Sequence, residues 1–474
     1  MPVKPTLFFY DLETSGIDPR KQRIMQFAGV RTDEDLNVIG EPMDVKVALA
    51  DDTLPDPYAV FVTGITPQQT REEGYSEAEF LKIFYEQVCV PGTTIVGFNN
   101  VRFDDEFMRF TLWRNYYDAY EWQWKDGCSR WDLLDVVRMT RALRPEGINW
   151  PVTPEGAPTN RLELLSHDNG LAHEKAHDAL SDVYALIDVA KLIKQKQPKL
   201  YGYLYNNRGK RDVERLAAPA TGQPFVYTSG RYPKETLHTT AVLSLAEGSQ
   251  AGRAVVYDLR YDPTEWVGTS VDELKKIRFA TRDMRAADGF MPLPVKEIAY
   301  NRCPAVAPLG TLDAAAQERL GLTLETIEKH RKILLSTDLA ATFAGVFAQG
   351  HEGAQDEDVD GALYGGGFVG DADKAKMRAL RAATTDDLKR FSADFNDERL
   401  NKLLLRYKAR NYPASLSSAE RESWEEYRSA RLAAMAPGFA KQLQELAAKN
   451  PTDNQQFLLQ ELQLWYENIM PSEV

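Results

Sequence analysis

Three short acidic motifs restrict the folds open to this chain. In the first, Asp11 and Glu13 follow the apolar run Leu7–Tyr10. A spacing of two puts both side chains on one face of an extended strand, and strand ends are where α/β folds build their sites. The pair also fits a plain turn, because Asp11–Gly16 contains turn-forming residues. Alone, the pair therefore leaves both interpretations open.

The second motif is Gly97–Glu106, in which a predicted strand ends at Phe98 and polar residues follow. Asp104 lies where a helix should begin, and it could simply cap that helix. Asp105 is its immediate neighbour. The sequence alone does not decide which of these two carboxylates points inward.

The third motif is His177–Asp182, at the start of a predicted helix, Ala176–Gln195, that Pro198 ends. A single histidine in such a place would be an ordinary polar contact. Together, however, the three motifs supply four carboxylates and one histidine from three separate element ends. Four carboxylates cannot pack together without compensation, since like charges raise one another's pKa.

Divalent metal ions would provide that compensation. Hard oxygen ligands suit Mg²⁺ or Mn²⁺, and two such ions, roughly 3.5–4 Å apart, stabilise both the attacking and the leaving oxygen of a phosphodiester. His177 would then take the proton from the attacking water. The motifs therefore favour metal-dependent hydrolysis of phosphodiesters.

Size and composition are those of a globular protein with more than one domain. At 474 residues the chain exceeds one ordinary domain. Its three cysteines are far apart and odd in number, which argues against a disulfide framework and for a reducing, cytoplasmic compartment. The first apolar run stops at Asp11, so we expect neither a signal peptide nor a membrane span. The net charge of −13 counts against nucleic-acid binding only when taken alone, because basic residues can be concentrated on one channel.

The pattern predicts four successive regions: an α/β domain over 1–198, a β-rich domain over 199–350, a linker over 351–373 and a helical domain over 374–474. Predicted strands are Leu7–Tyr10, Arg23–Arg31, Val38–Ala48, Thr93–Phe98, Phe225–Thr228, Thr239–Leu245 and Ala254–Leu259. The linker has seven acidic residues, six glycines and no Lys or Arg, so we expect it to be solvated and mobile. In the last region, Ser417 and Glu420 fit a capping box.

Several segments resemble known families. The exonuclease motifs of the DEDD superfamily are similar to FYDLETSG, GFNNVRFDDE and AHDALSD, and the histidine indicates the DEDDh branch. The bacterial exonuclease I family is similar in three longer blocks: SRWDLLDV (Ser129–Val136), LRPEGINWP (Leu143–Pro151) and YKARNYP (Tyr407–Pro413). The resemblance therefore extends over nearly the whole chain.

This resemblance implies a ribonuclease H-like exonuclease domain, an SH3-like domain and a helical carboxy-terminal domain. It implies a monomeric 3′→5′ exodeoxyribonuclease that digests single-stranded DNA to 5′-mononucleotides in DNA repair and recombination. The motif match assigns the metals to Asp11, Glu13, Asp104 and Asp182, with His177 as general base.

The segment Arg109–Trp124 contains seven aromatic residues and two arginines, a composition suited to non-specific binding of single strands. About half of these rings are expected in a core instead. The resemblance favours Arg109, Tyr120 and Trp124 as strand-facing, with Arg138 and Arg161 nearby. Phe103 could wedge against a terminal base or belong to the core, and Lys210 could line the channel entrance or lie on a solvated turn.

Members of the resembled family bind the acidic carboxy-terminal tail of single-stranded DNA-binding protein, and Arg144 and Tyr203 match positions implicated there. Two rival functions remain open from sequence. A DEDDh exoribonuclease or proofreading subunit would usually be much shorter than this chain. A nuclease-like scaffold that binds DNA without cutting it would be favoured by a missing ligand, yet all five motif positions are filled.

Overall fold

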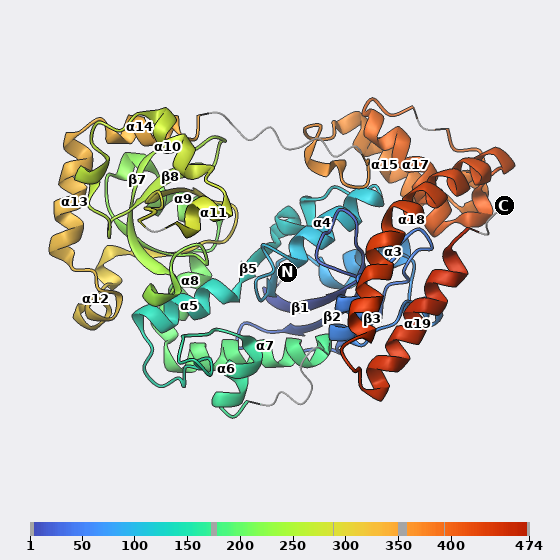
Figure 1. Cartoon of the computed structure of the whole chain (residues 1–474), viewed down its shortest axis with the longest axis horizontal. Coiled ribbons are helices and arrows are strands. Elements are labelled where there is room, and N and C mark those ends of the chain that lie inside the picture. Colours follow the sequence, from blue (N-terminus) through green and yellow to red (C-terminus); the bar gives the residue numbers. More distant parts are fainter. Residues whose placement is uncertain (1–3, 172–177, 288, 349–357, 393, 472–474) are drawn as a thin grey trace. The chain divides into compact units, whose positions relative to one another are not determined.

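A computed structural model of the chain describes residues 4–171, 178–287, 289–348, 358–392 and 394–471. Its contacts divide it into two units (Figure 1). The first unit comprises Met1–Ser129, His173–Leu186 and Gly353–Val474, and the second comprises Arg130–Ala172 and Ile187–Glu352. The first unit is therefore assembled from three pieces of chain, which brings the carboxy-terminal helices together with the amino-terminal sheet.

The sheet at the amino-terminal end has five strands in the order β3-β2-β1-β4-β5. Its strands are β1 (Thr6–Thr14), β2 (Ile24–Thr32), β3 (Met43–Lys46), β4 (Thr93–Gly97) and β5 (Ser129–Asp132). β1 runs antiparallel to β2 and parallel to β4, so the central strand has partners of both senses. The mixed sheet and its order agree with the expected ribonuclease H-like fold.

Alternation along β1 separates its two faces. Phe8, Tyr10 and Leu12 belong to a buried cluster that includes Phe80 and Phe107. By the period of two, the odd-numbered side chains of β1, among them Asp11 and Glu13, point to the opposite face. The strand therefore fixes one face as core and presents two carboxylates on the other.

The helices of the first unit's amino-terminal piece are α1 (Pro57–Thr63), α2 (Pro67–Glu73), α3 (Glu77–Ile83) and α4 (Asp104–Arg114). A π-helical turn, Phe84–Val88, continues α3. Ser76 and Glu79 form a capping box at the start of α3. α7 (Ala179–Lys196) starts in the first unit and continues into the second.

The carboxy-terminal piece is helical, as predicted, and packs on α1, α2 and α4. It contains α15 (Asp371–Ala382), α16 (Thr385–Leu388), α17 (Glu398–Asn411), α18 (Ser418–Ala447) and α19 (Asp453–Ile469) (Figure 1, orange and red). Val60 of α1 shares a buried cluster with Leu432 and Trp465. The predicted capping box of Ser417 and Glu420 is confirmed at the start of α18.

The second unit is built on an antiparallel five-stranded sheet in the order β10-β6-β7-β8-β9. Its strands are β6 (Phe225–Thr228), β7 (Thr239–Glu247), β8 (Arg253–Asp258), β9 (Val295–Ala299) and β10 (Ala305–Pro308). Its helices are α5 (Leu133–Leu143), α6 (Leu162–Asp168), α8 (Pro198–Asn206), α9 (Lys210–Ala217), α10 (Val271–Arg278), α11 (Arg282–Ala286), α12 (Ala314–Leu320), α13 (Leu324–Ser336) and α14 (Leu339–Gly345). This sheet corresponds to the predicted β-rich region.

Two sequence-based expectations need correction. The strand expected over Val38–Ala48 is reduced to β3, because Gly40 adopts a positive φ of 76° and only Val38 makes an isolated bridge to β2. The linker expected to be solvated over 351–373 is instead buried at Val359–Leu363, where Asp360 is fully inaccessible. Arg23 and Arg410 form ion pairs with Asp360, so its charge is compensated inside the protein and does not need water. Residues 351–357 lie outside the described residues.

Among the described helices, none combines the length and apolar character needed to cross a membrane.

Candidate active site

Asp11, Glu13 and Asp182 form an acidic group in the first unit. Asp11 and Glu13 come from the end of β1, and Asp182 comes from the first turns of α7. One carboxylate oxygen of each lies within 4.8 Å of those of the other two. The structure therefore brings together three of the four carboxylates that the sequence singled out.

The charges in this group oppose one another. Burial, and then the charge of Asp182, raises the pKa of Asp11 to about 8. Burial raises the pKa of Glu13 to about 9, with further contributions from Asp11, Asp182 and Asp178. Without a cation, the group would hold protons near neutral pH. Strongly shifted carboxyl groups clustered at strand and helix ends are typical of functional sites.

Asp104 and Asp105 have different environments at the start of α4. The Asp105 carboxylate is fully buried and accepts hydrogen bonds from Tyr10 Oη over 2.7 Å and from Asn100 Nδ2 over 3.2 Å. Asp105 therefore fastens α4 to the core face of β1. Asp104 is the first residue of α4 and is 5% exposed, and it lies outside the 4.8 Å group.

The predicted general base, His177, belongs to the stretch 172–177, outside the described residues. Its role stays a prediction. Asp178 directly follows it, and the Asp178 charge contributes to the raised pKa of Glu13.

The donor set suits a hard divalent cation. Carboxylate oxygens are the ligands that Mg²⁺, Mn²⁺ and Ca²⁺ favour, and among the described residues the group contains neither Cys nor His. A cation would also remove the repulsion that raises the pKa values of Asp11 and Glu13. The residues present therefore fit a divalent metal.

Arg109 and Tyr120 were predicted to face a nucleic-acid strand. Arg109 is only 6% exposed, and its guanidinium pairs with Glu106 and donates to Gln123 Oε1 over 3.1 Å. It also lies 5.5 Å from the centre of the half-buried Tyr120 ring. Arg109 therefore supports that ring, while its direct contact with a strand stays a prediction.

Two further rings, which the sequence analysis did not single out, contact Tyr120 or Glu106. Phe368 is 89% exposed, and its ring centre is 5.8 Å from that of Tyr120. Tyr364 is half exposed and donates a 2.5 Å hydrogen bond to Glu106. Both belong to the stretch predicted as a solvated linker. The acidic, glycine-rich composition of that stretch gave no indication that its aromatic residues have a binding role. The available signal was a pair of aromatic residues flanking the three glycines at 365–367.

The other predicted residues of the first unit differ in exposure. Trp124 is 63% exposed, as a strand-facing ring requires. Phe103 is half buried and packs against Phe107, with ring centres 5.1 Å apart. The packing against Phe107 supports the second of the two interpretations of Phe103, that its ring belongs to the core.

Five predicted residues belong to the second unit. Arg138 pairs with Asp135 at 2.7 Å, and Arg144 pairs with Asp313 at 3.0 Å. The remaining three are the exposed Arg161 at the start of α6, the exposed Lys210 at the start of α9 and the half-buried Tyr203 on α8. Their roles in binding stay predictions.

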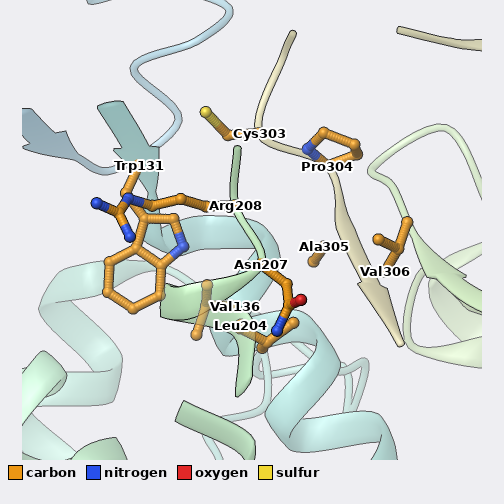
Figure 2. Close-up of a pocket in the computed structure, with 9 residues that line it drawn as sticks. All are labelled: Trp131, Val136, Leu204, Asn207, Arg208, Cys303, Pro304, Ala305 and Val306. Atoms are coloured by element: carbon orange, nitrogen blue, oxygen red, sulfur yellow. The ribbon is translucent and has the colours of Figure 1, made fainter. Parts of the chain in front are cut away.

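A pocket in the second unit has a different character (Figure 2). It is lined by Trp131, Val136, Leu204, Asn207, Arg208, Cys303, Pro304, Ala305 and Val306. The Arg208 guanidinium lies 4.0 Å from the centre of the Tyr205 ring. Since the lining contains no carboxylate, this pocket offers no metal site comparable to that of the first unit.

Three family models match the chain in succession. Residues 8–190 match the exonuclease model, 208–349 the exonuclease I SH3-like domain and 357–469 the exonuclease I C-terminal domain. The chain is 39% identical to exodeoxyribonuclease I of Haemophilus influenzae over 464 residues, 98% of each chain. It is 39% identical to exodeoxyribonuclease I of Escherichia coli over 457 residues, 96% of each chain.

Solved structures agree over the same length. Escherichia coli exonuclease I in complex with a dA16 oligonucleotide has a TM-score of 0.94 at 38% identity, covering 98% of this chain and all of that one. A zinc-bound Escherichia coli ExoI–ssDNA complex has a TM-score of 0.93 at 38% identity, with the same coverage. SSB/exonuclease I in complex with an inhibitor has a TM-score of 0.90 at 37% identity, covering 99% of this chain and all of that one.

Proposed function

Since the chain belongs to the exonuclease I family, we propose that it is a 3′→5′ exodeoxyribonuclease that digests single-stranded DNA to 5′-mononucleotides. The observation that carries this proposal is the buried group of Asp11, Glu13 and Asp182 in a chain that matches exonuclease I along its length. The relative of known structure bound to an oligonucleotide supports the substrate class.

Asp11, Glu13 and Asp182 hold the divalent metal on which cleavage depends, and we propose Mg²⁺, as two ions, for that metal. When bound, the metal supplies stabilisation of the negative charge that develops on the scissile phosphate. Asp104, at the first turn of α4, adds the fourth carboxylate. Zinc in a related structure supports divalent-metal binding in the family.

His177 accepts the proton from the attacking water in this proposal. The support for this role is the sequence motif, in which His177 stands five residues before Asp182. Imidazole suits the role because its ordinary pKa lies close to neutral pH.

The strand is held by exposed and half-buried rings of the first unit. Tyr120, Trp124, Tyr364 and Phe368 offer aromatic faces on which bases of any sequence can stack. Arg109 lies against Tyr120 and stabilises it through a cation–π contact. Of the second unit, Arg138, Arg161 and Lys210 are proposed to bind phosphates, because each carries a positive charge. The half-buried Phe103 ring, next to Asp104 in the sequence, is proposed to wedge against a terminal base.

The proposed partner is the acidic carboxy-terminal tail of single-stranded DNA-binding protein, received by Arg144 and Tyr203. A related SSB/exonuclease I structure supports this partner. Arg144 now pairs with Asp313, whose side chain is half exposed, so an acidic tail could exchange with that carboxylate. We further propose a monomer that acts in the cytoplasm in DNA repair and recombination.

The test is digestion of a 5′-labelled single-stranded DNA with Mg²⁺, beside matched duplex DNA, RNA and an EDTA control. Progressive shortening from the 3′ end, with duplex and RNA spared, is the expected result. Degradation of RNA instead would move the assignment to an exoribonuclease. Binding without any metal-dependent shortening would indicate an inactive scaffold.

A further inference from the structure

The turn between β1 and β2 begins after Thr14, one residue beyond Glu13. The pairing of β1 with β2 shifts register between Glu13 and Thr14, so the ladder is irregular directly after the Glu13 position. Bulges redirect side chains and are frequent beside active sites. Ser15 N–H donates to Arg23 O over 2.9 Å, and Arg23 N–H donates to Ser15 Oγ over 2.8 Å. The direction of Glu13 therefore depends on where Arg23 is held.

Arg23 is held by contacts inside the protein. Its side chain is buried, and Nη2 donates to Asp360 Oδ2 over 3.1 Å. Nη1 donates to the carbonyl oxygens of Lys21 and Gln22 over 3.0 and 3.2 Å. The same guanidinium thus binds the turn itself and a carboxylate that is 337 residues away in the sequence.

Asp360 belongs to a larger buried cluster of charges. It accepts two bonds from Arg410, from Nη1 to Oδ1 over 3.0 Å and from Nη2 to Oδ2 over 2.6 Å. Arg410 also pairs with Asp52 at 2.6 Å, and Arg431 Nε donates to the Asp52 carbonyl over 2.9 Å. Burial alone would raise the pKa of Asp360, but the charges of Arg410 and Arg23 hold it well below the usual range. The cluster therefore stays ionised.

Two further arginines bind the turn directly. Arg431, on α18, donates from Nη2 to Lys21 O over 3.0 Å. Arg114, at the end of α4, donates from Nη1 to Pro19 O over 3.2 Å. Together with Arg23, they bind the carbonyl groups of Pro19, Lys21 and Gln22.

We propose that this arginine–carboxylate cluster is a positioning device for Glu13: through Arg23 and Arg431 it fixes the bulged turn that directs the Glu13 carboxylate into the metal site. This inference rests on the proposed function. It assigns the carboxy-terminal piece a part in metal binding, because Asp360, Arg410 and Arg431 all belong to that piece. None of the three belongs to the group of Asp11, Glu13 and Asp182.

A cluster that served stability alone would affect melting and leave metal binding unchanged. Groups that orient metal ligands behave differently, since their mutation typically costs about 10–100-fold in metal affinity or activity. The discriminating measurement is therefore the Mg²⁺ dependence, followed both by the Mg²⁺-induced rise in melting temperature and by the rate of single-strand digestion.

The variant Asp360→Asn, in the full chain, should raise the Mg²⁺ concentration for half-maximal effect by about tenfold or more in both measurements. The KM for single-stranded DNA should change little, since the strand-holding rings are untouched. The matched control is Asp373→Asn. Asp373 is equally buried in the carboxy-terminal piece, but its carboxylate accepts bonds from the backbone N–H groups of Asn396 and Asp397. The Asp373→Asn variant should have a lower melting temperature and an unchanged Mg²⁺ dependence.

If Asp360→Asn fails to fold, Arg431→Lys replaces it as the test variant. Lysine keeps the positive charge but lacks the guanidinium group that donates to both Lys21 O and Asp52 O. It should shift the Mg²⁺ dependence in the same direction. An unchanged Mg²⁺ dependence in the folded variants, or an equal shift in Asp373→Asn, would overturn the inference. Failure of the wild-type protein to digest DNA with Mg²⁺ would instead overturn the proposed function.

Discussion

Replacing Asp182 by asparagine should remove most of the stabilisation that Mg²⁺ gives to the folded protein. A carboxylate oxygen of Asp182 lies within 4.8 Å of those of Asp11 and Glu13. Asparagine keeps the shape of the side chain but removes one of the three negative charges. The change therefore tests the charge of the group with little disturbance of packing.

The size of the effect follows from the geometry. Two unit charges 4.8 Å apart interact by about 3.5 kcal/mol at an effective dielectric constant of about 20. Loss of a charge at this range should weaken cation binding by at least about 100-fold, since each 1.4 kcal/mol is roughly tenfold. Mg²⁺ at about 100 times its Kd stabilises the wild type by about 2.7 kcal/mol, or roughly 3–5 °C in melting temperature for a chain of this size. At that concentration the variant should gain only about 1 °C.

The metal-free proteins should differ much less at neutral pH. Burial and the Asp182 charge raise the pKa of Asp11 to about 8, so much of the repulsion is already relieved by protonation. Asp182→Asn should therefore leave the metal-free melting temperature at about pH 7 unchanged or slightly higher.

The assay is thermal melting with and without Mg²⁺, supported by calorimetric titration of the metal. The matched control is Asp188→Asn on the same helix, where the carboxylate pairs with Lys191 at 3.5 Å near the surface. Such a pair contributes only about 0–1 kcal/mol, and the control should keep the full Mg²⁺ response. Asp182→Asn with the same Mg²⁺-induced shift as the wild type would refute the assignment of Asp182 as a ligand.

Four further outcomes are expected. The Mg²⁺-induced rise in melting temperature should be larger at about pH 8.5 than at about pH 6.5, because the metal must displace protons from Asp11 and Glu13, whose pKa values are raised to about 8 and about 9. In the metal-free protein, these two groups should lower stability as pH rises from about 4 towards 9, since the folded state retains protons that the unfolded chain has released; a flat response to pH would count against the raised values. Asp104→Asn should abolish cleavage and melt nearly as the wild type, whereas Asp105→Asn should cost about 1–3 kcal/mol of stability by disturbing the bond from Tyr10, and the reverse pattern would exchange their roles. Phe368→Ala should weaken single-strand binding by about 1–3 kcal/mol in a fluorescence titration, with the exposed Phe457 on α19 as the control ring, and equal effects at both positions would contradict a specific stacking role for Phe368.

Local periodicity predicted the parts of the site that depend on local geometry. Asp11 and Glu13 share a face because strand side chains alternate, and the structure keeps both in β1. The choice between Asp104 and Asp105 was open because it depends on Tyr10, which approaches from another element. Neighbouring residues at a helix start carry no sequence signal for such a contact.

Composition misled where distant charges meet. The acidic, glycine-rich stretch was expected to be solvated, yet Asp360 is fully buried. Its partners Arg23 and Arg410 are 337 and 50 residues away in the sequence, so no local pattern predicts the pairing. The same stretch presents Phe368 to solvent beside Tyr120. Both features depend on the carboxy-terminal piece packing against the amino-terminal sheet.

The most direct test of the central claim compares digestion of a 5′-labelled single strand by the wild type, Asp11→Asn and Asp188→Asn across a range of Mg²⁺ concentrations. The account predicts 3′→5′ shortening by the wild type and by Asp188→Asn that stops with EDTA. It predicts no shortening by Asp11→Asn at any Mg²⁺ concentration, with the strand still bound. Wild-type rates from Asp11→Asn, or digestion that persists in EDTA, would contradict the claim that these carboxylates hold the catalytic metal.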